Sequence, residues 1–221
     1  MENQTITSCY NELGLNRILD SETFSLDVVE GVVRNPAQTR VVYFSEDIIK
    51  GVHAGLVEET GPAWTTIMQN CGRLWGERLS ERLDRELSSM SNTSLGELPI
   101  GDFNKYLQNY FSIHGFGKLL LDVGLTQEHG IVICRLENSF FAQVLRDEKG
   151  MVDFLLAGTL EVLISKLSNH DLGCIEVASE RRGDECGVFL ISSSNRIAKL
   201  EPLVESGEDV DTCIKALIDN E

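Results

Sequence analysis

Positive charge is scarce in this sequence. Lysine and arginine supply 19 residues against 35 of aspartate and glutamate, which gives a formal net charge of −16 over 221 residues. Binding to nucleic acid depends on clustered Lys and Arg that displace counterions from phosphates, and charge-driven binding to anionic lipid needs basic clusters as well. The composition therefore argues against a nucleic-acid-binding protein and against a protein held on membranes by charge alone.

Long apolar runs and a secretory signal are also lacking. No uninterrupted apolar stretch approaches the ~20 residues of a membrane-spanning helix, and residues 1–4 show neither a basic region nor an apolar run. The six cysteines form no CxxC pair, so we expect reduced thiols, with Cys71 and Cys134 in the core. These features predict a cytoplasmic protein without a transmembrane segment.

Signatures of the common catalytic and cofactor sites are missing. The sequence has no Walker loop, no GxSxG elbow and no HExxH motif, and its four histidines are far apart. The run Gly115-Phe116-Gly117 lacks the third glycine of a dinucleotide fingerprint and precedes a predicted strand, whereas the fingerprint must follow one. No nicotinamide, flavin, P-loop or hydrolase motif is present, which favours a protein that is not an enzyme.

Helical and strand patterns alternate along the chain, whose hydrophobic content of 42% is enough for one elaborated domain. Strands are expected where β-branched and apolar residues cluster, and helices where apolar residues recur every three or four positions. The expected strands are 41–44, 118–125, 130–137, 173–179 and 187–193, with a turn at 126–129. The expected helices are 46–59, 62–89, 102–114, 140–146 and 152–168. This order predicts an α+β fold with an antiparallel sheet of two β-hairpins packed with several helices.

Glycines within the two long helices predict close contacts. Gly72 and Gly76 lie four residues apart in the helix 62–89, and Gly158 lies in the middle of the helix 152–168. Glycine costs helix stability, so its presence there indicates that a second backbone or a ligand comes near. Farther along the first helix, charge pairs at i,i+4 such as Arg82 with Glu86 predict a solvated face.

Two segments of the chain form a recognisable pattern. One consists of Arg40-Val-Val-Tyr-Phe44 and a helix that ends at Glu58-Glu59-Thr60-Gly61. The other consists of Phe154-Leu-Leu-Ala-Gly158-Thr-Leu160, Gly173-Cys-Ile-Glu176, Gly183-Asp184 and Phe189. Together they resemble the 4-vinyl reductase domain, a small-ligand-binding family similar in fold to a subunit class of the TRAPP vesicle-tethering complex. The resemblance covers roughly residues 40–193. The acidic, cytosolic character and the N-terminal part look like the cyanobacterial branch associated with photosystem II assembly.

The resemblance divides the chain into an N-terminal extension (1–39), a ligand-binding domain (40–193) and an acidic, helical C-terminal tail (194–221). It implies a non-enzymatic homodimer that binds an apolar ligand, a chlorophyll precursor or another tetrapyrrole, and that assists photosystem assembly proteins at the periphery of the thylakoid membrane. Two alternatives stay open: a reductase of a tetrapyrrole vinyl group, and a dimeric scaffold without a specific ligand.

The family's zinc-binding signature is incomplete in this chain. The signature is a Glu, two residues, a Cys, three residues, a Gly, three residues, a Cys, one residue and a Phe, which here falls on Glu176, Ser179, Gly183, Gly187 and Phe189. Serine and glycine are poor replacements for the two thiolates, so no zinc is expected. Cys174 and Glu176 are only weak metal candidates, and Glu176 is expected to have an ordinary polar role near the turn.

An aromatic stripe provides the candidate ligand site. Phe103, Tyr106, Tyr110 and Phe111 lie on one face of the helix 102–114, and His114 ends it. Core packing is the commoner role of such a face, but two tyrosines there need hydrogen-bond partners that a ligand could supply. His114 is either a hydrogen-bonded histidine at a helix end or an axial ligand or donor to a tetrapyrrole. The predicted ligand-binding residues are Trp75, Phe103, Tyr106, Tyr110, His114, Phe140 and Phe141.

Overall fold

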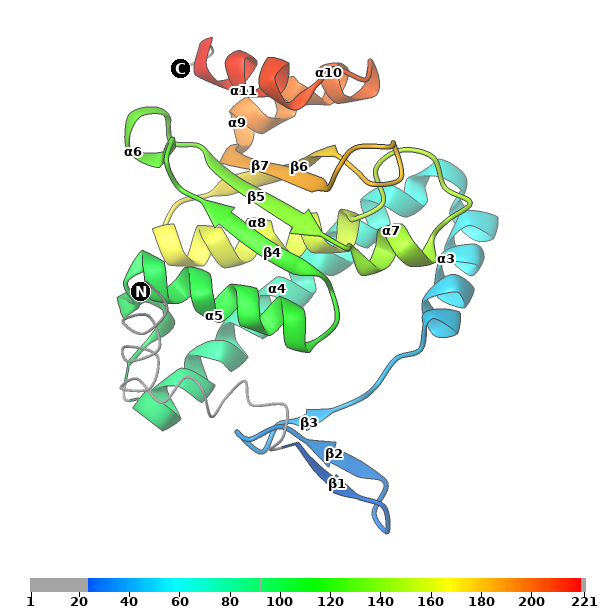
Figure 1. The fold of residues 1–221 in the computed structure, drawn as a ribbon, viewed down its shortest axis with the longest axis vertical. Coiled ribbons are helices and arrows are strands. Elements are labelled where there is room, and N and C mark those ends of the chain that lie inside the picture. The colour runs from blue at the N-terminus through cyan, green and yellow to red at the C-terminus, as the bar shows by residue number, and fades with distance from the viewer. Residues whose placement is uncertain (1–23, 92, 220–221) are drawn as a thin grey trace.

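The computed structural model describes residues 24–91 and 93–219, so residues 1–23 of the predicted N-terminal extension lie outside it. The fold is α+β, as the sequence predicts. Its main sheet is antiparallel with the strand order β4-β5-β7-β6 (Figure 1). The strands are β4 (Lys118–Asp122), β5 (Val132–Glu137), β6 (Leu172–Ala178) and β7 (Gly187–Ser193). Two hairpins, β4–β5 and β6–β7, are joined by pairing of β5 with β7.

The long helices cover one face of this sheet. They are α4 (Trp64–Ser91), α5 (Ile100–Ile113) and α8 (Phe154–Ser168), with the short α7 (Phe140–Val144) beside them (Figure 1). Their apolar faces and the inward side chains of the strands form the larger of two cores. Although α4 has 28 residues, none of the helices described is both long and apolar enough to cross a membrane.

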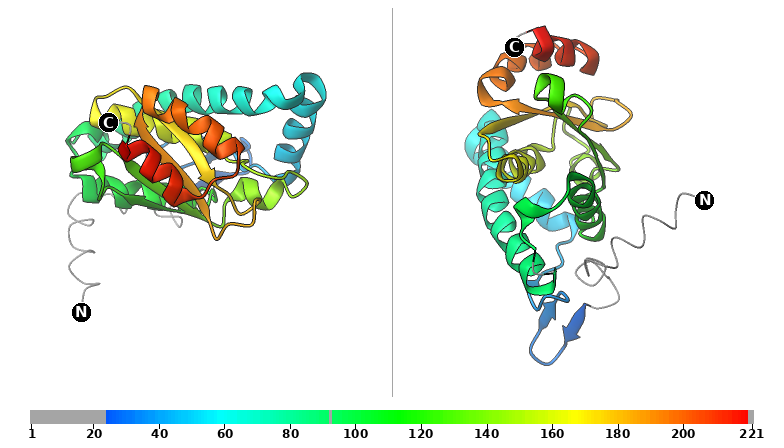
Figure 2. Two further views of the ribbon diagram at one scale, coloured as in Figure 1. Left: turned by 90° about the horizontal axis from the view of Figure 1, so that it is seen from above. Right: turned by 90° about the vertical axis from the view of Figure 1, so that its left-hand side faces the viewer.

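The other face of the sheet is covered by the C-terminal helices α9 (Ser194–Ile197), α10 (Glu201–Glu205) and α11 (Val210–Asp219), as Figure 2 shows from above. Strand β5 alternates accordingly: Cys134 belongs to the large core, and Ile133 belongs to a second core with Cys213 and Leu217 of α11. Side chains of neighbouring strand residues point to opposite faces, so a sheet covered on both sides has both sets buried. The acidic tail is helical, as predicted, and its apolar side is part of this second core.

Helices α4 and α8 cross at their glycines. A Cβ atom added to Gly72 would lie 2.1 Å from the carbonyl oxygen of Leu155, and one added to Gly158 would lie 2.1 Å from that of Gln69. Thr159 donates a hydrogen bond across the crossing to the Gly72 carbonyl oxygen, at 3.2 Å. The close backbone approach predicted from these glycines is confirmed, with the other helix as the neighbour.

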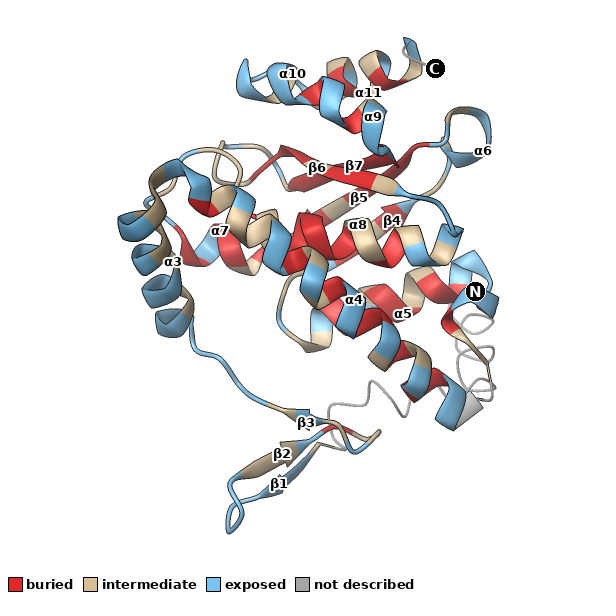
Figure 3. Ribbon diagram, turned by 180° about the vertical axis from the view of Figure 1, so that it is seen from behind, coloured by how far each residue is buried: buried red, intermediate tan, exposed pale blue. Residues whose placement is uncertain are grey.

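An N-terminal arm projects from this body (Figures 1 and 2). The arm is a small antiparallel sheet of β1 (Ser25–Asp27), β2 (Val32–Arg34) and β3 (Arg40–Val41), and it leads through residues 42–45 into α3 (Glu46–Thr60). The predicted strand 41–44 is wrong beyond Val41, because the following three residues have no strand partner and are exposed. Figure 3 shows that α3 is mostly exposed, and none of its residues is buried.

Two further local predictions differ from the structure in part. The segment Thr126–His129 connects the hairpin β4–β5 as predicted, and it forms one helical turn, α6, closed by Gly130 in the left-handed conformation. Cys71 is an exposed thiol, whereas Cys134 is buried as predicted. On α4, Cys71 is exposed, whereas its neighbour Gly72 lies at the crossing with α8. The spacing of apolar residues in the sequence did not distinguish these two faces of the helix.

Candidate functional site

A cavity of about 590 Å³ lies where the ends of several elements meet. Helices α4, α5 and α7 and the start of α8 supply one part of its wall, and the residues that connect the arm to α3 supply the other. Its walls are mainly aromatic and aliphatic. The lining residues are Arg40, Val41, Val42, Tyr43, Phe44, Ile49, Trp75, Arg82, Tyr110, Ile113, His114, Gly115, Phe116, Phe140, Phe141 and Leu155.

Five of the seven side chains predicted to bind ligand line this cavity: Trp75, Tyr110, His114, Phe140 and Phe141. The other two, Phe103 and Tyr106, are 0% exposed and belong to the large core. All of the residues from α5 lie on one stripe, but its first turns face the sheet and only its last turn and the following residues reach the cavity. The structure thus divides the stripe between core packing and a cavity wall.

The aromatic rings around the cavity contact one another. The rings of Tyr110 and His114 are stacked with centroids 4.0 Å apart, and those of Trp75 and Phe116 are 5.4 Å apart in a tilted arrangement. Phe140 and Phe141 of α7 meet edge to face at 5.6 Å. Such contacts fix ring orientations and leave a preformed apolar wall.

Burial keeps two polar side chains of this wall, His114 and Tyr110, neutral. Desolvation lowers the pKa of His114, although a hydrogen bond of 2.8 Å between Nδ1 and the Tyr110 carbonyl oxygen opposes the shift. With the proton on Nδ1, the lone pair lies on Nε2. Desolvation also raises the pKa of the Tyr110 phenol, although the neighbouring Arg82 opposes it. At neutral pH both side chains are therefore hydrogen-bonding groups without charge.

Arg82 is a residue of the cavity wall that sequence reasoning did not select. Its guanidinium Nη2 donates a hydrogen bond of 2.6 Å to the Tyr110 hydroxyl, and its Cζ lies 5.7 Å from the centre of that ring. The predicted solvated face is wrong here, because Glu86 is 6% exposed and Arg82 lines the cavity. The arm causes this burial: Asn35 and Thr39 both donate hydrogen bonds to Glu86 Oε1.

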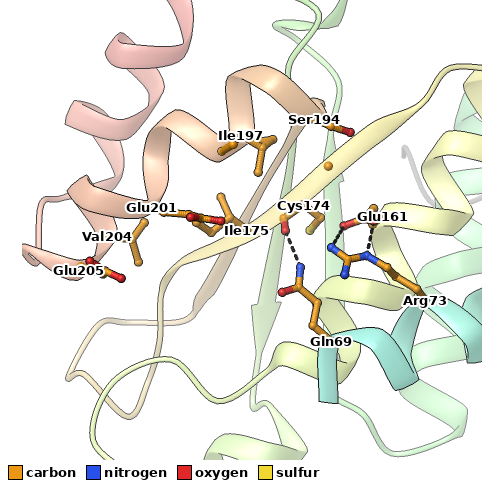
Figure 4. A pocket seen from close by; sticks show the side chains of 12 residues that line it. Gln69, Arg73, Glu161, Cys174, Ile175, Ser194, Ile197, Glu201, Val204 and Glu205 are labelled. Carbon is orange, nitrogen blue, oxygen red and sulfur yellow. Dashed lines mark hydrogen bonds and ion pairs between the residues drawn. The ribbon is translucent and has the colours of Figure 1, made fainter. Parts of the chain in front are cut away.

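A second cavity of about 380 Å³ lies beside β6, between α4, α8 and the C-terminal helices (Figure 4). Its single arginine among the described residues, Arg73, is paired with Glu161: Nε and Nη2 donate to the two carboxylate oxygens at 2.5 and 3.0 Å, and Nη1 donates to Asn70 Oδ1 at 2.8 Å. Glu201 and Glu205 add two more carboxylates to the wall. This cavity is acidic, and its arginine is paired with a carboxylate rather than facing an open space.

The two weak metal candidates have other surroundings. Cys174 is buried, and desolvation raises the pKa of its thiol well above the ordinary value, so it is a protonated core side chain. Glu176 is buried near the end of β6 and accepts hydrogen bonds from the backbone N–H groups of Val152 and Asp153 at 3.0 and 2.9 Å. Within residues 24–91 and 93–219, no three or more His, Cys, Asp or Glu side chains are grouped so that they could hold a metal ion.

Comparison with known proteins shows that the fold of this chain is similar to that of a solved structure. No protein-family model and no curated protein matches the sequence. Among solved structures, the chain is similar to the phenol-responsive sensory domain of the transcription activator PoxR, determined with phenol. The TM-score is 0.64 at 15% identity, over 86% of this chain and 94% of that one. The two chains share a fold.

Two other solved structures are similar at a TM-score of 0.47. One is a vinyl-4-reductase family protein from Methanocaldococcus jannaschii, at 14% identity over 87% of this chain and 96% of that one. The other is a trafficking protein particle complex subunit 3 from Naegleria fowleri, covalently bound to palmitic acid, at 13% identity over 66% and 93%.

Proposed function

We propose that the protein is a non-enzymatic small-ligand-binding domain whose ligand occupies the aromatic cavity. The observation that carries the proposal is the cavity itself: about 590 Å³, with apolar and aromatic walls and few polar groups. Ligand sites of proteins have this size and this character. The fold likeness to a sensory domain determined with phenol supports the same function. In this chain Trp75, Phe116, Phe140 and Phe141 would hold the apolar body of the ligand.

Shortening Phe140 to alanine is expected to weaken binding of a neutral aromatic probe, 2-naphthamide, by about tenfold, since a lost aromatic contact is of the order of 1.4 kcal/mol. Isothermal titration calorimetry on the purified protein measures this affinity. The matched control is Phe154→Ala, because Phe154 is also half-buried but packs on Trp64 outside the cavity. Equal affinities of F140A and the wild type would place the ligand elsewhere.

A narrower form of the proposal names a tetrapyrrole, such as a chlorophyll precursor, as the ligand. The neutral imidazole of His114 supports it, because imidazole ligates both haem iron and chlorin magnesium. Assistance to photosystem II assembly at the thylakoid is the role that the sequence resemblance implies for such a ligand. In the same titration, a tetrapyrrole that displaces 2-naphthamide supports this form, and one that leaves the probe bound contradicts it.

We also propose that the chain forms a homodimer through its N-terminal arm. Eight of the ten large hydrophobic side chains found exposed in the described part of the chain lie in the arm, the connecting segment and α3. They are Leu26, Val28, Val29, Val42, Tyr43, Phe44, Ile48 and Val52. A concentration of exposed apolar side chains of this kind is typical of a protein interface.

Replacing Val29, which is 89% exposed, by glutamate is expected to reduce the mass in solution from a dimer to the 24.6 kDa of one chain. A charge in the centre of an apolar interface costs several kcal/mol, because it loses its water on association. Light scattering at several concentrations measures the mass. Leu74→Glu, an equally drastic change at an exposed apolar residue of α4, should leave the dimer intact. A monomeric wild type would overturn the proposal.

A further inference from the structure

The described residues that line the aromatic cavity carry charge of one sign. Among these sixteen residues of the described part of the chain are two arginines, Arg40 and Arg82, and no aspartate or glutamate. In a chain with a net charge of −16, this is an unusual surface. The cavity beside β6 shows the opposite composition, since its described lining residues include three glutamates and one arginine.

Arg82 keeps hydrogen-bonding capacity for a ligand. A guanidinium carries five N–H donors, and Nη2 of Arg82 uses one of them on the Tyr110 hydroxyl. Its Nε is buried and has no hydrogen-bond acceptor in the described part of the chain. The Glu86 carboxylate is 4.0 Å from that nitrogen, which makes an ion pair without a hydrogen bond.

Glu86 is held back from Arg82 by the arm. Its Oε1 accepts hydrogen bonds from Asn35 Nδ2 at 3.1 Å and from Thr39 Oγ1 at 2.6 Å. Arg73, by contrast, donates three hydrogen bonds, two to the carboxylate of Glu161 and one to Asn70 Oδ1. Of these two cavity arginines, Arg82 has more donors left for an incoming anion.

We propose that the cavity binds an aromatic carboxylate, with the carboxylate on the Arg82 guanidinium and the Tyr110 hydroxyl and the ring system among Trp75, Phe116 and Phe140. This inference rests on the proposed function of the cavity. The flat donor edge of a guanidinium matches a carboxylate, and hydrogen bonds between charged partners are about twice as strong as neutral ones. The exposed Arg40 at the edge of the cavity adds a second positive charge that attracts the anion.

Two probes of equal shape test the proposal: 2-naphthoate, which is an anion, and 2-naphthamide, which is neutral. In calorimetric titrations at low salt, the wild type is expected to bind 2-naphthoate about tenfold more tightly than 2-naphthamide. Arg82→Gln should abolish this preference and leave the 2-naphthamide affinity within about twofold. Arg78→Gln removes the same charge from an exposed site of α4 outside the cavity, and it should keep the preference.

The outcomes separate this inference from the proposed function. If the wild type binds neither probe, the cavity is not a ligand site and both fail. If it binds both equally, or if the preference survives in R82Q, the carboxylate assignment is overturned while the cavity stands. If R82Q binds neither probe, a second variant, Arg82→Lys, tests the assignment, because lysine retains the positive charge. Tighter binding of 2-naphthoate than of 2-naphthamide by R82K supports the assignment. Binding of 2-naphthamide by R82K without a preference for 2-naphthoate contradicts it.

Discussion

Replacing Gly158 by alanine is expected to lower the free energy of unfolding by about 3 kcal/mol, the upper range for overpacking a core. The new Cβ atom would lie 2.1 Å from the Gln69 carbonyl oxygen and 2.9 Å from the Arg73 nitrogen. Both are backbone atoms, so no side-chain rotation can relieve the clash, and α8 must move away from α4. Leu155 of α8 and Trp75 of α4 both line the aromatic cavity, so the same movement should weaken ligand binding.

Urea denaturation followed by circular dichroism measures this loss of stability. Gly55→Ala provides the matched control, because Gly55 is a helical glycine of α3, and a Cβ atom added to it would have no neighbouring atom within 4 Å. There alanine should raise the free energy of unfolding by up to about 1 kcal/mol, since it has the higher helix propensity. An unfolding midpoint of G158A equal to that of the wild type would show that the two helices do not cross at this glycine.

The stability of the protein is expected to fall as the pH rises from about 4.5 to 7, with two buried carboxyl groups as the cause. Asp153 and Glu176 are 0% and 2% exposed. Desolvation raises the pKa of Asp153 to about 7, although a hydrogen bond from Ser139 opposes it. Desolvation and the proximity of Asp153 raise the pKa of Glu176 well above the usual range. The N–H groups of Val152 and Asp153, which stabilise its anion, do not outweigh its burial.

The sign of this pH dependence follows from the numbers of protons that the folded and unfolded states bind. Unfolded carboxyl groups lose their protons near pH 4, whereas the folded pair retains them at higher pH. Between these values the folded state binds more protons, so each such proton reduces the free energy of unfolding by about 1.4 kcal/mol per pH unit. For Asp153 the loss is complete once the pH exceeds about 7.

Asp153→Asn removes one titrating group and retains an oxygen for the Ser139 hydroxyl, which lies 2.6 Å from Oδ1. Its free energy of unfolding, measured in urea from pH 4.5 to 7.5, should depend less steeply on pH than that of the wild type. Asp171→Asn changes the same residue type at an exposed site outside this cluster and should follow the wild type. Parallel profiles of D153N and the wild type would contradict the assignment.

Much of the fold follows from local sequence patterns. The strands β6 and β7 are buried along almost their whole length, so their apolar composition marks them without reference to the rest of the chain. The glycines of α4 and α8 are equally informative. Glycine is costly in the middle of a long helix, so a close neighbour is expected there, and the crossing at Gly72 and Gly158 supplies it.

The candidate site was predictable only in part, because its boundary depends on contacts between distant segments. Tyr106 and Tyr110 lie one helical turn apart on the same stripe and both belong to the large core, yet only Tyr110 also lines the cavity. The periodicity of apolar residues within α5 does not distinguish these two tyrosines. Arg82 and Glu86 have the spacing of an exposed ion pair, and residues 35–39, about fifty positions earlier, are what cover Glu86.

The two-sided sheet sets the order in which the chain can fold as it leaves the ribosome. The second core joins side chains of the strands, such as Ile133 and Leu190, to Leu200, Cys213 and Leu217 from a later segment. While β7 is emerging, that segment is still inside the exit tunnel, and one face of the nascent sheet remains open to water. Domains complete folding as units, so this one acquires its full stability only after α11 has emerged, and a nascent chain stalled before that point would expose an apolar surface to chaperones.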